Sequence, residues 1–136
     1  MDKIKEFFKK DQFAEYVGIE LLEAGLGTAV ARLEIKDRHL NGVGIVHGGA
    51  VFSLADLAFA VASNSHGTVA LAINADISFL KAVSAGVLTA RAWEVSRNSK
   101  LATYRIDVTE DGGDLVAVFQ GTVYRKKEAL PGLTDS

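Results

Sequence analysis

The sequence predicts an α+β domain in which one antiparallel sheet of six strands wraps around a single long, buried helix. Three observations predict this fold class. An apolar run at 47–64 has the length of a helix and almost no polar face. Two shorter strands precede it, and the residues after it alternate between apolar and polar with a period of two. A sheet built from such strands can curve around one helix on its concave face.

The first third of the chain predicts a short N-terminal helix and a hairpin. Residues 3–16 carry apolar side chains at helical spacing, with a break near Asp11. A strand is expected at 20–24 and a second at 29–35, joined by a turn that contains two glycines. The polar, glycine-rich residues 36–46 predict a loop before the long helix.

The remainder of the chain predicts the long helix and four long strands. The helix is expected to end at His66 and Gly67, and its many alanines allow neighbouring elements to approach closely. The tail that follows holds the only proline, and we expect it to be disordered. The predicted strands span 69–79, 87–95, 102–109 and 115–124, the domain spans 1–127, and the tail spans 128–136.

Length and composition limit the classes of protein to which the chain can belong. Its 136 residues fit one domain, and 49% hydrophobic residues are enough for a core. A formal net charge of −2 argues against a nucleic-acid partner held by bulk charge. The absence of cysteine excludes disulfides and thiolate chemistry. Neither a secretory signal nor a sufficiently long apolar span is found, so we expect a cytoplasmic protein without a membrane partner.

The clearest chemical signal lies at the start of the long helix. Gly48 and Gly49 follow His47 where unpaired backbone N–H groups can donate to an oxyanion or a polarised carbonyl. Asp56 is the one carboxylate in an otherwise apolar helix, and a buried acid is costly unless it is paired or used. Together these residues suggest acyl chemistry, in which the helix start polarises a carbonyl and the acid activates water.

The spacing of Gly48 and Asp56 favours a site shared between two chains. Their separation along a helix is about 12 Å. An oxyanion donor and a catalytic acid that act on one carbonyl both lie within roughly 3–4 Å of the reacting atoms. Two antiparallel copies can bring Asp56 of one chain to Gly48 of the other, so we expect a homodimer.

This motif resembles that of hotdog-fold acyl-CoA thioesterases of the phenylacetate-pathway (PaaI-type) family, over about residues 12–127. The resemblance implies a sheet wrapped around the helix, paired chains, a possible further pairing into a tetramer as a dimer of dimers, and hydrolysis of acyl-CoA thioesters, with phenylacetyl-type aromatic acyl groups as one candidate class. It implies no cofactor, since coenzyme A is part of the substrate. The matching residues are Asn41-Gly42-Val43-Gly44-Ile45-Val46-His47-Gly48-Gly49, Ser53-Leu54-Ala55-Asp56 and Tyr124-Arg125.

The resemblance also implies roles for individual residues. Asp56 would activate water or attack the thioester, while the Gly48 N–H, helped by Asn41, would polarise the carbonyl. His47 would shape the loop and not act as a base. Some relatives orient water with a Ser or Thr on the strand after the helix, a role open here to Asn74 or Ser78. One departure is the stretch 81–86 at the rim of the pocket, which lacks the Pro-Gly turn that members of the family often carry there.

Each of these residues also has a plainer interpretation. Asp56 could pair with an arginine, the two glycines could only permit close packing, and Asn41 could be an ordinary turn residue. A catalytic triad of Ser53, His47 and Asp56 is disfavoured, because helix spacing puts the three on different faces and turns. The histidines at 39, 47 and 66 lack metal-ligand spacing, so we expect no metal site.

Further residues are candidates for contact with the substrate. Cations near strand ends suit the phosphates of coenzyme A, although each of them also fits a solvated rim. Aromatic residues are interpreted first as core, Phe79 and Trp93 among them, although Phe52 and Phe59 could line an acyl pocket. The candidates for substrate and coenzyme A binding are Gly49, Phe52, Asn74, Ser78, Arg97, Lys100 and Arg125.

The sequence therefore predicts an acyl-CoA thioesterase and leaves two alternatives open. The first is a non-catalytic module that binds acyl-CoA or lipid on the same fold, which Asp56 and Asn41 argue against. The second is a hydratase or dehydratase, for which His47 is the only indication.

Overall fold

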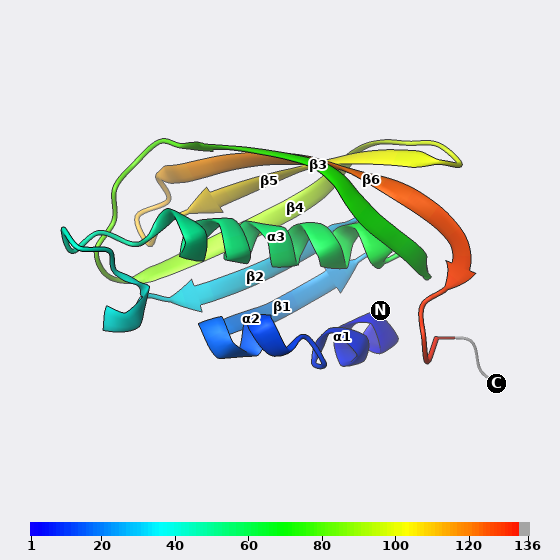
Figure 1. Ribbon diagram of the computed structural model, residues 1–136, viewed down its shortest axis with the longest axis horizontal. Helices are drawn as coiled ribbons and strands as arrows, with labels where there is room; N and C mark the ends of the chain where they lie inside the picture. The colour runs from blue at the N-terminus through cyan, green and yellow to red at the C-terminus, as the bar shows by residue number, and fades with distance from the viewer. Residues whose placement is uncertain (134–136) are drawn as a thin grey trace.

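The computed structural model describes residues 1–133, and in it one sheet wraps around one long helix (Figure 1). The six strands pair antiparallel in the order β1-β2-β4-β5-β6-β3. The predicted fold class is thus confirmed. The strands are β1 Ile19–Gly25, β2 Thr28–Glu34, β3 Thr68–Phe79, β4 Val87–Arg97, β5 Leu101–Thr109 and β6 Leu115–Ala129, and the helices are α1 Asp2–Phe8, α2 Gln12–Val17, the 3-10 turn η1 Asp37–His39 and α3 Gly48–Asn64.

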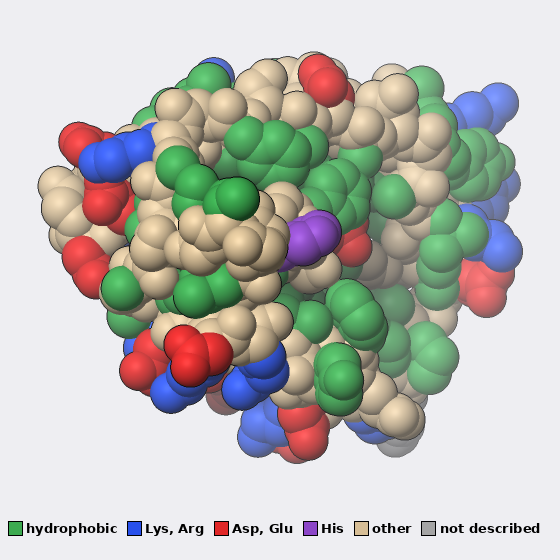
Figure 2. All heavy atoms as spheres, turned by 60° about the vertical axis from the view of Figure 1, so that its left-hand side comes forward, with side chains coloured by type: hydrophobic (Ala, Val, Ile, Leu, Met, Phe, Trp, Pro, Cys, Tyr) green, Lys and Arg blue, Asp and Glu red, His purple; other side chains and the backbone are tan. Residues whose placement is uncertain are grey.

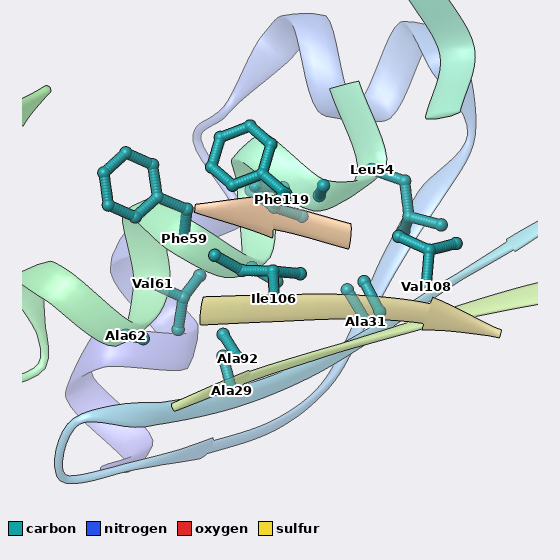
Figure 3. Close-up of a cluster of buried hydrophobic side chains, with 14 of the residues drawn as sticks. Ala29, Ala31, Leu54, Phe59, Val61, Ala62, Ala92, Ile106, Val108 and Phe119 are labelled. Carbon is teal, nitrogen blue, oxygen red and sulfur yellow. The ribbon is translucent and has the colours of Figure 1, made fainter. Parts of the chain in front are cut away.

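The core lies between α3 and the concave face of the sheet. Phe59 of α3 packs against Phe119 of β6, with ring centroids 5.4 Å apart, and Ile106 of β5 lies beside them (Figure 3). Gly121 on β6 has to lack a side chain, because a Cβ there would come within 2.6 Å of the Phe59 ring. The alternation of small and large side chains lets the helix approach the sheet closely.

The N-terminal helix is divided in two, as the break near Asp11 predicted. Asp11 is the N-cap of α2, and its Oδ1 accepts a hydrogen bond from the Ala14 N–H at 2.9 Å. Both short helices pack on β1 and on α3, and Ile4 and Ala14 are their buried residues. They therefore cover part of α3 that the sheet leaves open.

One stripe of α3 stays partly exposed in the single chain. It contains Gly49, Phe52, Ser53, Asp56 and Ala60, whose spacing of three and four residues puts them on one side of the helix. Most other residues of α3 after Val51 are buried. The stripe therefore shows where neither the sheet nor the short helices cover the helix.

Phe79 and Trp93 were expected in the core, and the structure corrects this prediction. Phe79 is 55% exposed at the end of β3, an edge strand that no further strand covers in the described chain. Trp93 is 39% exposed on the outer face of the sheet, where Arg105 lies 5.7 Å from its ring. Period-two alternation identifies two faces of a strand but does not say which of them is covered.

The strand β6 extends beyond the boundary expected at 127. It runs to Ala129, and the Leu130 N–H donates to the Gly67 carbonyl at 3.0 Å while its side chain is buried. The strand and the contacts of Leu130 thus continue into the stretch where the tail was expected, and 134–136 lie outside the described residues. Among the described helices, none is long and apolar enough to cross a membrane.

A partly buried polar network joins the residues after α3 to the sheet. Glu94 Oε1 accepts hydrogen bonds from the Tyr104 hydroxyl at 2.8 Å and from His66 Nε2 at 2.7 Å, and Arg97 Nε donates to Oε2 at 3.2 Å. Burial opposes ionisation of Glu94, but these donors outweigh it and lower its pKa. Burial and the Glu94 hydrogen bond both raise the pKa of Tyr104, which stays a neutral donor.

We predict that Tyr104→Phe destabilises the protein by about 1.5–3 kcal/mol, because a hydrogen bond to a charged group is lost in the core. The exposed Tyr124→Phe is the control and should leave the midpoint of urea unfolding unchanged. Since the pKa of Glu94 is lowered on folding, its stabilising effect is present above the ordinary pKa of 4.5 and lost as pH falls below it. Equal midpoints for both variants at pH 7 would contradict the prediction.

Candidate active site

The loop before α3 is held by a histidine to which the sequence analysis gave no role. The His39 side chain is buried; its Nδ1 accepts the Lys36 N–H at 2.9 Å and its Nε2 lies 2.6 Å from the Val17 carbonyl. These partners require the neutral tautomer with the proton on Nε2. The His39 carbonyl in turn accepts the His47 N–H at 2.7 Å. His39 thus joins the end of α2 to the start of α3.

Asn41 organises the turn that precedes the helix. Its side-chain Oδ1 accepts the N–H groups of Val43 at 3.0 Å and Ile45 at 3.1 Å, and its own N–H donates to the Ile45 carbonyl at 2.7 Å. The plainer interpretation of Asn41 as a turn residue therefore fits its oxygen. Its side-chain NH₂ has no hydrogen-bond partner in the described part of the chain.

The start of α3 leaves one backbone donor free. His47 is the N-cap, and its Nδ1 accepts the Gly49 N–H at 2.8 Å. Among the described residues, the Gly48 N–H has no hydrogen-bond partner. It stands at the positive end of a helix of 17 residues, where partial charges from aligned peptide dipoles favour an anion. His47 therefore shapes the helix start, and Gly48 retains a donor for an oxygen atom from outside the chain.

The free Gly48 N–H borders an apolar cavity of about 420 Å³. The Phe79 ring lies over Gly48, so that a Cβ on Gly48 would stand 3.2 Å from the ring edge. The rim is formed by the stretch after β3, where Val46 N–H donates to the Val83 carbonyl at 2.8 Å. Lys81 pairs with acidic residues of the β5–β6 turn and ties this rim to the sheet.

Asp56 is a half-buried carboxylate with no partner of its own. In the described chain it makes no hydrogen bond or ion pair. Burial, and secondly the negative charge of Asp11, raise its pKa. It lines a cavity of about 230 Å³ together with Asp11, Phe13 and Phe52. Within one chain, Asp56 is therefore neither a capping acid nor half of a salt bridge.

Gly48 and Asp56 line different cavities. Gly49 belongs to a third cavity of about 340 Å³, which contains His47 but not Asp56. Figure 2 shows the end of the molecule at which α3 begins, where a histidine stands at the edge of a hollow among hydrophobic side chains. A single chain thus presents the donor and the acid in separate places.

Ser53 does not form a triad with His47 and Asp56. Its Oγ donates to the Gly49 carbonyl at 2.7 Å, and His47 Nδ1 is occupied by the Gly49 N–H. Ser53 and Asp56 do line the same cavity, although helix spacing was expected to separate them. In the described part of the chain, no three His, Asp or Glu side chains gather as a metal site would require.

Asn74 and Ser78 lie on the face of the sheet that points away from α3. Ile77 is paired with Phe119, whose ring packs on α3, so the residues on either side of Ile77 face outward. Asn74 pairs with Thr122 and Ser78 with Val118 on that outer face. The structure therefore does not bring these two side chains to Gly48 or Asp56 of the same chain.

The three candidate cations do come together around the turn between β4 and β5. Arg125 Nη1 donates to the Asn98 carbonyl at 2.7 Å, and its N–H donates to the Lys100 carbonyl at 2.7 Å. Arg97 is held by Glu94 next to this turn. We call Arg97, Lys100 and Arg125 the cation cluster. It lies at the end of the molecule where α3 finishes, opposite the helix start (Figure 1).

Comparisons with known proteins show the family to which the chain belongs. The chain is 43% identical to a protein of Archaeoglobus fulgidus provisionally named an esterase, over 96% of this chain and 86% of that one. It is 36% identical to the acyl-coenzyme A thioesterase PaaI of Escherichia coli, over 92% of this chain and 90% of the relative.

Solved structures of related proteins also resemble this chain. The phenylacetic acid degradation protein PaaI of Escherichia coli superposes with a TM-score of 0.88 at 33% identity, covering 91% of both chains. The PaaI protein of Thermus thermophilus gives a TM-score of 0.82 at 41% identity, covering 85% of this chain and all of that one. The family model described as the thioesterase superfamily matches residues 43–117. The chain therefore belongs to the thioesterase superfamily and is a thioester hydrolase with the hotdog fold that its sequence predicted.

Proposed function

We propose that this protein hydrolyses acyl-CoA thioesters at a site shared between two chains, with the Gly48 N–H as oxyanion donor and Asp56 as the group that activates water or attacks the carbonyl. The observation that carries the proposal is the pair of unused groups on α3. One backbone donor and one carboxylate remain without partners in the described chain. The acyl-CoA thioesterase named among the relatives supports the same reaction.

The chemistry follows from the two groups. A thioester carbonyl oxygen that accepts the Gly48 N–H becomes more negative as the tetrahedral intermediate forms. One such donor is typically worth about 2.7–4 kcal/mol in the transition state. Asp56, when ionised, can take a proton from water as the water oxygen attacks the carbonyl carbon, and the CoA thiolate leaves. Direct attack by Asp56 would form an anhydride that water then cleaves.

The shared site rests on three features of the single chain. The donor and the acid line separate cavities. The stripe of α3 that holds Asp56 is built mainly from small residues, so a second helix can approach it. The edge strand β3 exposes Leu71, Ile73 and Phe79 along an unpaired edge of the described sheet. An antiparallel second copy would cover these features and bring its helix start toward Asp56.

The same pairing gives the cation cluster a use. It lies far from the Gly48 of its own chain, at the other end of α3. In an antiparallel pair with Asp56 opposite the partner's Gly48, α3 continues about 12 Å past the partner's helix start and ends at Asn64, on the side of the cluster. The cluster could then meet the phosphates of a coenzyme A whose thioester is bound at the partner's Gly48.

We predict that Asp56→Asn lowers kcat for phenylacetyl-CoA by at least about a hundredfold, because the amide cannot accept the proton of water. Thiol release is the assay. In the wild type, the acid limb of kcat/KM should lie above pH 3.8, the ordinary value for Asp, since the pKa of Asp56 is raised. Binding of the thioester without release in the wild type would instead favour a non-catalytic module, and unchanged turnover in the variant would refute the role of Asp56.

The same variant has a matched control and a second readout. Asp76→Asn removes an exposed acid on the outer face of β3 and should retain full activity. Because the pKa of Asp56 is raised on folding, its ionised form destabilises the protein above that pKa. Asp56→Asn should therefore raise Tm at pH 7 and leave it unchanged at pH 3. A fall in Tm would identify Asp56 as a structural acid.

We predict that Gly48→Pro lowers kcat by about 10²–10³-fold, while Gly48→Ala has a much smaller effect. Gly48 is the first residue of α3, where proline is tolerated, and His47 already has the extended backbone that precedes proline, with φ −62° and ψ 137°. Proline removes the N–H, whereas alanine makes the same Cβ contact with Phe79 and keeps the donor. Equal losses in both variants would point to crowding by Phe79 and not to the donor.

We predict complementation between inactive chains. A mixed dimer of Asp56→Asn with Gly48→Pro contains one site with both groups intact, so it should regain roughly half the activity of a wild-type dimer. Differently tagged chains, co-expressed and purified through both tags, supply the mixed dimer. If each site lies within one chain, the isolated mixed dimer will stay inactive.

A further inference from the structure

The cavity around Asp56 has a wall that comes from the N-terminal helices. Asp11 and Phe13 of α2 face Phe52 and Asp56 of α3 across about 230 Å³ of space. The match to the family model begins at residue 43, so this wall lies outside the matched part of the chain. Because this wall borders the carboxylate of Asp56, it is well placed to select substrates.

The lining of this cavity limits what can occupy it. Apart from Ser53, the side chains around the two carboxylates are apolar, and Phe13 is 64% exposed toward the open side. Among the described residues that line it, none is Lys, Arg or His. The phosphates of coenzyme A would find no partner there and two carboxylates to repel them. The acyl group of a thioester, whose carbonyl carbon has to reach Asp56, fits this lining.

Asp11 carries a charge into the cavity as well as capping α2. One oxygen, Oδ1, accepts the Ala14 N–H, and no hydrogen bond is made by the other oxygen within the described chain. The pKa of Asp56 is raised mainly by burial and secondly by the negative charge of Asp11. An acyl group with a carboxylate at its far end would meet the same repulsion.

We propose, on the basis of the proposed function, that α2 forms one wall of the acyl subsite, where Phe13 contacts an uncharged acyl group and the Asp11 carboxylate excludes acyl groups that end in a carboxylate. The substrate class is then neutral acyl-CoA with an apolar or aromatic acyl group. Monothioesters of dicarboxylic acids are excluded by charge and not by size.

The test compares hexanoyl-CoA with adipoyl-CoA, which differ only in the end of a chain of the same length. The wild type should prefer hexanoyl-CoA by about a hundredfold or more in kcat/KM. Asp11→Asn should lower the ratio of kcat/KM for hexanoyl-CoA to that for adipoyl-CoA about tenfold, because asparagine keeps the N-cap and removes the charge. Glu15→Gln, which removes an exposed charge from α2 outside the Asp56 cavity, should leave the ratio unchanged.

Phe13 has its own comparison. Phe13→Ala should lower kcat/KM for phenylacetyl-CoA about tenfold and change acetyl-CoA little, because only the larger acyl group reaches the ring. Trp93→Ala, which removes a partly exposed aromatic side chain from the outer face of the sheet, is the control. Circular dichroism and Tm verify that all four variants are folded.

The outcomes separate this inference from the proposed function. A wild type that cleaves none of these thioesters overturns both. A wild type that cleaves hexanoyl-CoA, with Asp11→Asn and Glu15→Gln giving the same selectivity, overturns the role of α2 alone. A selective change in Asp11→Asn and Phe13→Ala supports it.

Discussion

Burial of α3 constrains every other element of this fold. The helix is apolar around most of its circumference, and a sheet covers only one side of a helix. The sheet therefore curves around α3, and the two N-terminal helices cover a further part. What stays open is the stripe from Gly49 to Ala60, with Asp56 in it. The position of the acid follows from where coverage of the helix ends.

The loop that leads into α3 determines which backbone N–H groups at the helix start are hydrogen-bonded and which stays free. His39 fixes the loop to α2, Asn41 closes the turn, and His47 takes the Gly49 N–H. Each of these contacts satisfies a polar group that folding would otherwise leave unpaired. The Gly48 N–H is left over, and because its neighbours are bonded it points in a fixed direction. Such a donor needs no rearrangement when negative charge develops on a carbonyl oxygen.

The sequence predicted the elements well because local signals determine them. Periodicity located the long helix and all six strands, and the predicted break near Asp11 falls between the two short helices. The sequence-based prediction of which side chains are buried was wrong where burial depends on contacts between distant parts of the chain. Trp93 alternates like a core residue, but the outer face that it occupies is uncovered in one chain. Phe79 packs over Gly48, yet it stands at the end of an edge strand and keeps 55% of its surface exposed. Asn74 and Ser78 lie on the outer face of the sheet in one chain, and their role in orienting water stays a prediction.

For the candidate site too, the sequence identified the residues that lie close together along the chain and missed those that act across elements. The motif from Asn41 to Asp56 identified the helix start and the acid because both lie on one continuous stretch of chain. Neither His39 nor Asp11 could be assigned a role, since each acts on a residue from another element. Spacing along one helix did, however, anticipate that Gly48 and Asp56 would not share a cavity.

The surroundings of Asp56 connect catalysis to assembly under the proposed function. In the described chain, its cavity contains a second carboxylate and no cation, so nothing there can balance an oxyanion. An anionic intermediate beside two carboxylates in one chain would be repelled. The positive end of a helix supplies the missing charge, and the α3 start of the same chain lies too far along the helix to do so. If the α3 start of a partner faces Asp56, its positive end can stabilise the oxyanion while the carboxylate activates water. The reaction then requires two paired chains, whatever pairing adds to stability.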